Sequence, residues 1–197
     1  MKKENLLKDF LGKFTILSDK EVEELSQKLN VKEYKKGNIL QSVGEVPTLC
    51  FFVLDGCVRQ YHFIEGVEKT TDFYTSKNGA IASDCYVLQK PSPFFLECSD
   101  DCILLVGDPE LDQKLFAEYP ILKSIITEVM EKEWLKTRNE LATFKHSSPE
   151  QRYLNLLENN ADLLNIVPNH QIASYLGITP ESLSRIRKRL LTKSKLQ

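Results

Sequence analysis

Residues 169–190 of the chain read NHQIASYLGITPESLSRIRKRL and decide the fold, because they have the pattern of two short helices joined by a glycine turn. Ile172, Ala173 and Leu176 recur at the spacing of one buried face of the first helix. Gly177 suits the left-handed backbone conformation that commonly ends a helix. The stretch therefore predicts a helix-turn-helix unit.

The second helix of this unit carries its own start signals. Thr179 is placed to act as the N-cap, Pro180 as the first helical residue, and Glu181 near the positive end of the helix dipole. Apolar residues recur three and seven positions apart and predict the face that packs on the first helix: Leu183, Ile186 and Leu190.

The opposite face of the second helix is charged, and in such units this helix enters the major groove with its N-terminal residues toward the bases. Arg185 lies one turn after Glu181, so we expect the arginine to donate to guanine and the carboxylate to accept from cytosine. Lys188 and Arg189 lie further along and are expected to meet phosphates. The predicted DNA-binding residues are Thr179, Glu181, Ser182, Arg185, Lys188 and Arg189.

The distribution of charge agrees with this assignment. The chain has 26 basic and 28 acidic residues, a net charge of -2. Residues 168–197 contain six basic residues against one acidic residue, a local balance of +5 that leaves -7 for the first 167 residues. An acidic body with a basic tip is expected when one end of a protein meets a polyanion.

The remainder of the chain predicts an α+β protein of 197 residues. Residues 18–21 have the form of a capping box and open a lead-in helix. From residue 34 to about 108, short apolar runs alternate with turn residues, which predicts a double-stranded β-helix or jelly roll of about eight strands. The runs 49–54, 58–64 and 102–106 have the length and composition of strands.

A short helix at 109–118 precedes a long one that starts at Pro120 and ends near residue 144. Its apolar residues are spread too widely for one narrow seam, so we expect it to pack on the roll and, through residues 120–144, on a second copy of the chain. An ordinary helix packed within one monomer is the alternative. Residues 146–148 form a polar hinge, and Ser148 with Gln151 predicts the capping box of the next helix. The predicted domains are 1–108, the roll with its lead-in helix; 109–146, the dimerisation helix; and 147–197, the helix-turn-helix domain.

This order of elements resembles the Crp/Fnr family of bacterial transcription regulators over essentially the whole chain. The run 179–185, TPESLSR, is similar to the start of that family's recognition helix, and 34–37 (YKKG) and 54–56 (LDG) are similar to its roll glycines. The resemblance implies a cyclic-nucleotide-binding-like roll, an inverted-repeat DNA operator and a homodimer. Few residues follow the recognition helix before Gln197, so the family's wing is not expected, and Lys193 and Lys195 are expected to replace part of its charge.

The sequence departs from the family at the phosphate cassette, where the Gly-Glu pair aligns with Ala82 and Ser83, and the Arg-Ser pair with Ser92 and Pro93. These residues supply no guanidinium to offset the desolvation of a phosphate, so specific binding of cyclic AMP is not expected and no cofactor is assigned. Phe94 follows this loop and, with Phe95, is a candidate for lining the pocket of a small hydrophobic effector.

Three other classes of function were weighed. A cupin-like enzyme is disfavoured because His62 is the only histidine in the roll region, so no enzymatic activity is expected. A redox or metal sensor is an alternative, since Cys98 and Cys102 are separated by one turn, although the five cysteines are predicted to be reduced thiols. A signalling or scaffold module whose helix-turn-helix contacts protein is the other alternative. No apolar run spans a bilayer and no secretory signal is present, so the sequence predicts a cytoplasmic protein without membrane contact.

Overall fold

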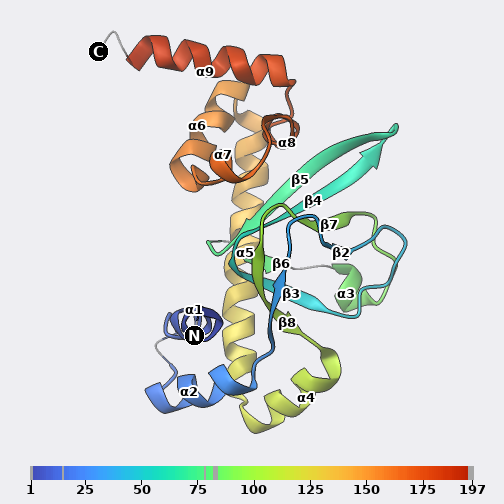
Figure 1. Cartoon of the computed structure of the whole chain (residues 1–197), viewed down its shortest axis with the longest axis vertical. Helices are drawn as coiled ribbons and strands as arrows, with labels where there is room; N and C mark the ends of the chain where they lie inside the picture. Colours follow the sequence, from blue (N-terminus) through green and yellow to red (C-terminus); the bar gives the residue numbers. More distant parts are fainter. Residues whose placement is uncertain (1, 15, 78, 82–83, 195–197) are drawn as a thin grey trace.

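A computed structural model describes residues 2–14, 16–77, 79–81 and 84–194. The chain starts with two helices, α1 (Lys2–Leu11) and α2 (Asp19–Lys28), which lie beside the lower part of the long helix (Figure 1). The predicted capping box of α2 is confirmed: Ser18 Oγ accepts from the backbone N–H of Glu21, whose carboxylate accepts from the N–H of Ser18. Helix α1 was not predicted, although Leu7 and Leu11 bury its apolar face.

The predicted jelly roll is confirmed as two antiparallel sheets of four strands within the described residues, in the orders β1-β8-β3-β6 and β2-β7-β4-β5. Short helix α3 (Asp84–Leu88) connects β6 to β7. The strands are β1 (Val31–Tyr34), β2 (Ile39–Gln41), β3 (Cys50–Asp55), β4 (Cys57–Ile64), β5 (Val67–Thr75), β6 (Ala80–Ile81), β7 (Phe95–Cys98) and β8 (Cys102–Gly107).

Side chains from both sheets alternate inward and form one apolar core, because successive residues of a strand point to opposite faces. Val53, Val58 and Leu104 are completely buried there. The β3–β4 turn requires glycine: Gly56 has a φ of +89°, and a Cβ at this position would lie 2.4 Å from the carbonyl oxygen of Asp101.

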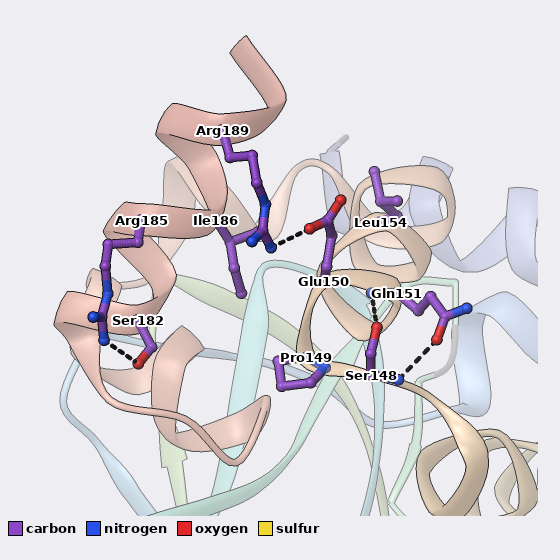
Figure 2. A pocket seen from close by; sticks show the side chains of 9 residues that line it. All are labelled: Ser148, Pro149, Glu150, Gln151, Leu154, Ser182, Arg185, Ile186 and Arg189. Atoms are coloured by element: carbon purple, nitrogen blue, oxygen red, sulfur yellow. Dashed lines mark hydrogen bonds and ion pairs between the residues drawn. The ribbon is translucent and has the colours of Figure 1, made fainter. Parts of the chain in front are cut away.

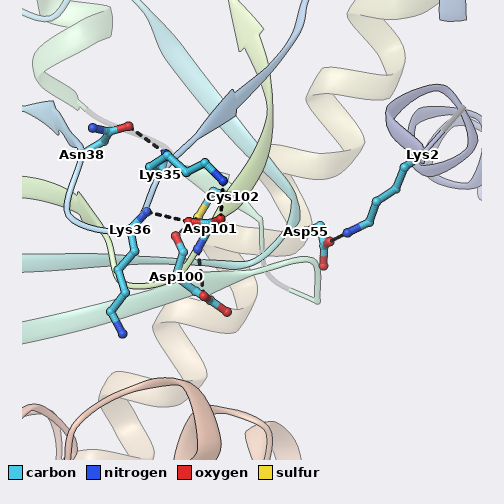
Figure 3. A network of polar contacts seen from close by, with 8 residues as sticks. All are labelled: Lys2, Lys35, Lys36, Asn38, Asp55, Asp100, Asp101 and Cys102. Carbon is cyan, nitrogen blue, oxygen red and sulfur yellow. Dashed lines mark hydrogen bonds and ion pairs between the residues drawn. The ribbon is translucent and has the colours of Figure 1, made fainter.

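One end of the roll is held by a polar network (Figure 3). Lys35 Nζ, in the turn after β1, lies 2.6 Å from a carboxylate oxygen of Asp101, and the backbone N–H of Lys36 donates to the other oxygen at 3.0 Å. The β1–β2 turn is thereby tied to the turn that leads into β8. Each of these two turns carries the chain between the two sheets, so the network fixes the positions of two sheet-to-sheet connections relative to each other.

Two helices follow the roll, α4 (Pro109–Glu118) and the 26-residue α5 (Ile121–His146). The predicted start of α5 was wrong by one residue, since Pro120 lies at the N-cap and the helix begins at Ile121. Leu122 and Ile125 are buried in a cluster with α1, α2 and β3, so one side of α5 packs on the roll as expected. A second face of α5, formed by Ile126, Met130 and Trp134 at four-residue spacing, exposes large apolar side chains. The helix has three further exposed apolar residues: Leu135, Leu141 and Phe144.

The C-terminal domain contains α6 (Pro149–Asn160), α7 (Leu163–Ile166), α8 (Asn169–Tyr175) and α9 (Pro180–Ser194). It sits at the end of α5 remote from α1 and α2 (Figure 1). The predicted break near the hinge is present: α5 ends at His146, and Ser148 caps α6 through a capping box with Gln151.

Candidate nucleic-acid interface

The turn between α8 and α9 has the geometry expected from its sequence. Gly177 has a φ of +67°, and its N–H donates to the carbonyl of Ser174 at 3.0 Å. The N–H of Ile178 donates to the carbonyl of Ala173 at 2.9 Å, which completes the Schellman pattern of hydrogen bonds. Ile178 also packs on the domain core. The turn therefore fixes the angle between the two helices of the helix-turn-helix unit.

The start of α9 is capped as predicted. Thr179 Oγ1 accepts from the backbone N–H of Ser182 at 3.3 Å and donates to the hydroxyl of Ser182 at 3.2 Å. Leu183 and Ile186 are buried against α6 and α8, and Leu190 packs partly against the same core. These contacts determine which face of α9 is left for solvent.

The exposed face of α9 carries Glu181, Arg185 and Lys188, one helical turn apart. The guanidinium of Arg185 donates to Ser182 Oγ at 3.2 Å and forms no ion pair among the described residues. The pKa of Glu181 is lowered, first by a backbone hydrogen bond at the helix N-terminus, then by Thr179 and by the charge of Arg185. The helix start therefore presents an ionised carboxylate and, one turn later, an exposed guanidinium without an ion-pair partner in the described chain.

Arg189, by contrast, is engaged within the chain. Its guanidinium forms an ion pair with Glu150 in the first turn of α6 (Figure 2). A cavity of about 600 Å³ lies between these two helices and is lined by the start of α6 and by Ser182, Arg185, Ile186 and Arg189 of α9. The sequence predicted that Arg189 contacts phosphate. It did not predict the ion pair with Glu150, because the two residues are distant in sequence.

Arg187 is a structural residue. Its Nε donates to the hydroxyl of Tyr153 at 3.1 Å, and its Nη1 donates to Asn169 Oδ1 at 2.7 Å. The side chain thereby ties α9 to α6 and α8. Of the six basic residues counted in residues 168–197, Arg187 is thus directed into the fold, and Lys195 lies outside the described residues.

The C-terminal domain packs directly on the roll through α8 and β5. The backbone N–H of Thr70 in β5 donates to Ser174 Oγ at 2.9 Å. Next to it, the ring of Phe73 meets the ring of Tyr175 edge-on at 5.4 Å. Cys57 and Phe73 of the roll belong to the same apolar cluster as the helices of the C-terminal domain. The position of α9 relative to the roll therefore depends on β5 as well as on the hinge.

Arg152 reinforces the hinge from α6. It donates to the carbonyl of Leu176 at 2.9 Å and to that of Ser147 at 2.8 Å, and its guanidinium lies 4.4 Å from the ring centre of Phe144. One side chain thus connects the end of α5, the start of α6 and the end of α8.

The structure gives Ser92 a role that differs from ligand binding. Ser92 is 2% exposed, and its hydroxyl accepts from Gln41 and from the N–H of Phe94 while donating to the carbonyl of Phe94. All of its hydrogen-bonding capacity is used within the roll. Pro93 is exposed, and the other two cassette positions, Ala82 and Ser83, lie outside the described residues.

The suggested apolar pocket lined by Phe94 and Phe95 is not formed. Phe94 is buried in the core between the sheets. Phe95 stacks on Tyr61 with a centroid distance of 5.1 Å and also meets Phe63, on the other face of its sheet. The ring of Phe94, just before β7, lies in the core and the ring of Phe95 lies outside it, so the two rings do not line one cavity.

The cysteines are free thiols. Cys102 lies beside the network of Figure 3, with its sulfur 3.2 Å from the carbonyl oxygen of Asp100, and is buried together with Cys98 in the roll core. Burial raises the pKa of the Cys57 thiol. Across the part of the chain that the structure describes, no three His, Cys, Asp or Glu side chains are grouped to hold a metal ion.

None of the helices in the described part of the chain is both long and apolar enough to cross a membrane.

The chain shares its fold with solved bacterial regulators. FixK2 from Bradyrhizobium japonicum is 18% identical with a TM-score of 0.67, covering 84% of this chain and 86% of its own. A CooA mutant from Carboxydothermus hydrogenoformans is 17% identical, with a TM-score of 0.62 and coverage of 85% and 78%. The Catabolite Activator Protein of Thermus thermophilus is 18% identical, with a TM-score of 0.53 and coverage of 92% and 87%. No family model and no curated protein matches the sequence. The fold implied by the resemblance to the Crp/Fnr family is confirmed.

Proposed function

We propose that the chain is a cytoplasmic, non-enzymatic transcription regulator of the Crp/Fnr type that binds DNA as a homodimer. The observation that carries this proposal is the exposed face of α9, where Glu181 and Arg185 lie one turn apart at the capped helix start. The shared fold with CooA, FixK2 and Catabolite Activator Protein supports it.

Within this proposal the residues of α9 have separate roles. Arg185 donates two parallel hydrogen bonds to guanine, and Glu181, held ionised, accepts from cytosine. Thr179 and Ser182 position these side chains through the cap, and their hydroxyls lie beside the DNA backbone. Lys188 contacts phosphate and adds affinity without sequence preference.

The second face of α5 is the dimer interface of this proposal. Trp134 is 62% exposed and Ile126 45% exposed, and with Met130 they recur every four residues along one side of the helix, next to the residues that pack on the roll. A helix with two apolar sides requires a second partner, and an identical helix related by two-fold symmetry supplies one. Such a dimer would present two copies of α9 to successive major grooves about 34 Å apart, which calls for an inverted-repeat operator.

The roll is proposed not to respond to cyclic AMP. The structure describes two of the cassette residues. The hydroxyl of Ser92 already makes hydrogen bonds within the roll, and Pro93 has no hydrogen-bond donor. A cyclic phosphate would therefore lose its hydration without receiving equivalent donors from these positions.

Selection of DNA from a random pool with the purified chain tests the proposal. An enriched inverted repeat is expected, and Arg185→Ala should relax preference at one position of each half-site at a cost of about 1–3 kcal/mol. Lys36→Ala, an exposed lysine of the roll, is the matched control and should bind as the native chain does.

Failure to enrich any sequence, with the chain folded and dimeric, would instead favour the second candidate, a scaffold whose helix-turn-helix contacts protein.

A further inference from the structure

A cavity of about 900 Å³ lies where the roll meets the C-terminal domain. Its lining residues come from strand β5, the last turns of α5, and helices α6 and α8 with the turn that follows α8. Figure 1 shows where these elements meet, at the end of α5 that carries the C-terminal domain. This volume falls in the range that small-molecule sites occupy in proteins. Neither of the described cassette residues, Ser92 and Pro93, lines this cavity.

Polar side chains from all four elements converge on this cavity. Asp72 comes from β5, Glu140 from α5, Asn155 and Asn159 from α6, and Tyr175 from α8. Amide, hydroxyl and carboxylate oxygens of this kind are acceptors, so the wall can receive hydrogen bonds from a donor-rich ligand.

The two cationic side chains that line the cavity are already occupied. Lys136 Nζ lies 3.5 Å from Glu140 and 3.6 Å from Glu133. Arg152 donates to two backbone carbonyls and stacks over an aromatic ring. Lys136 therefore acts on Asp72 only through its nearby charge, and neither cation forms an ion pair with that carboxylate in the described part of the chain.

Asp72 is a further carboxylate of this cavity. Among the described residues it forms no ion pair, and its Oδ1 accepts only from the backbone N–H of Phe73 at 2.7 Å. The pKa of Asp72 is raised to about 7, mainly because the protein shields the carboxylate from water. The hydrogen bond from Phe73 and the charge of Lys136 lower this pKa, and the charges of Glu140 and Glu133 raise it. Asp72 is only partly exposed to solvent, and a carboxylate removed from water without an ion-pair partner is costly, so a proton or a bound cation relieves that cost.

We propose that this interdomain cavity binds a small aliphatic amine, whose ammonium group is held by Asp72 and Glu140. An ammonium group has three donors and a compact positive charge. Asp72 supplies the carboxylate without an ion pair, and Glu140, which also meets Lys136 at 3.5 Å, supplies further acceptor oxygens together with the surrounding amides. The amine takes the place of the proton on Asp72.

The position of the site gives it a regulatory consequence, which rests on the proposed function. A ligand that touches β5, α5 and the C-terminal helices together favours the arrangement in which α8 is packed on β5. A ligand shifts such an equilibrium by its difference in affinity for the two arrangements. The amine would thereby bias the position of the recognition helix.

Isothermal titration of the full chain with 1,4-diaminobutane tests the inference, and DNA is left out so that its result is independent of the DNA selection. Saturable binding with one molecule per chain is expected at pH 8. Because a proton competes for Asp72, the apparent Kd should rise about tenfold for each pH unit below 7. The neutral analogue 1,4-butanediol should not bind.

Asp72→Asn is the decisive variant, because the amide keeps the shape of the side chain, removes its charge and does not need to be protonated to be buried. It should weaken amine binding at pH 8 at least about tenfold. Glu158→Gln changes an exposed carboxylate of α6 outside the cavity and should leave binding unchanged. Equal binding by native and Asp72→Asn chains, equal binding of the diol, or no saturable binding would each overturn the inference.

Discussion

Removal of the Arg189 side chain should affect DNA binding far less than its place on α9 suggests, because Glu150 already neutralises it. Each phosphate contact contributes about 0.9 to the slope of log affinity against log salt concentration. Lys188 is exposed and forms no ion pair within the described chain, so Lys188→Ala should reduce that slope by about 0.9. Arg189→Ala should reduce it by less than about 0.4, since a guanidinium already paired with a carboxylate does not neutralise a phosphate and so releases no condensed cation from the DNA.

Glu150→Gln should allow Arg189 to contact a phosphate of the DNA. With the carboxylate gone, Arg189 becomes free to meet a phosphate, and the slope should increase by about 0.9. Adding Arg189→Ala to this variant should return the slope to the native value. Arg189 is 56% exposed and Glu150 22%, so the pair contributes at most about 1 kcal/mol to folding and its loss leaves the domain intact.

Fluorescence anisotropy on the selected operator, at four salt concentrations, measures these slopes. Glu158→Gln removes a negative charge from the same helix without touching Arg189 and corrects for the general change in charge. If Arg189→Ala in the native background lowers the slope as much as Lys188→Ala does, the ion pair opens on DNA and the reasoning fails.

Three further predictions concern the scaffold of the site. Gly177→Ala should destabilise the chain by about 1–2 kcal/mol through its left-handed φ of +67° and should also weaken DNA binding, because an aromatic carbon of α5 would lie 3.3 Å from the new Cβ. Gly66→Ala has a similar φ of +76° in open space, so thermal unfolding should show a comparable loss with DNA binding intact. Ser174→Ala leaves the buried N–H of Thr70 without an acceptor and should cost about 1–3 kcal/mol, seen as faster amide exchange at Thr70; unchanged exchange would contradict the contact. The pKa of Asp72 is about 7 in the folded chain, above its unfolded value. The free energy of unfolding should therefore fall as the pH rises from about 4 to 7, by up to about 1.4 kcal/mol per pH unit. Urea titrations of Asp72→Asn should show no such dependence on pH from this residue.

Local signals in the sequence determine much of the fold. The cap at Thr179, the turn at Gly177 and the capping boxes at Ser18 and Ser148 each act over three or four residues, and all four are present in the structure. The three strands for which ranges were predicted, 49–54, 58–64 and 102–106, were located to within one residue, because turn residues separate them. Such features are encoded by neighbours along the chain, so a single sequence suffices to predict them.

Contacts between distant residues were beyond the sequence pattern. Thr70 and Ser174 are 104 positions apart, and nothing in either segment indicates that a strand of the roll would bond to the first helix of the helix-turn-helix unit. The charge of Arg189 was visible in the sequence, but its partner Glu150 belongs to another helix. Burial of Asp72 likewise depends on three elements meeting, so an acidic residue in an alternating strand gave no sign of it.

Docking of the C-terminal domain on β5 gives the roll a route to the recognition helix that the hinge alone would not supply. Any rotation about Ser147 and Ser148 that moves α8 from β5 must break the hydrogen bond between Thr70 and Ser174 and separate Phe73 from Tyr175. A hydrogen bond of this kind contributes about 0.5–1.5 kcal/mol, and an aromatic pair adds about 0.5–1.5 kcal/mol. Their sum, about 1–3 kcal/mol, matches the usual range of coupling free energies between sites. The docked position is therefore stable enough to be a distinct arrangement and weak enough for a bound ligand or DNA to shift.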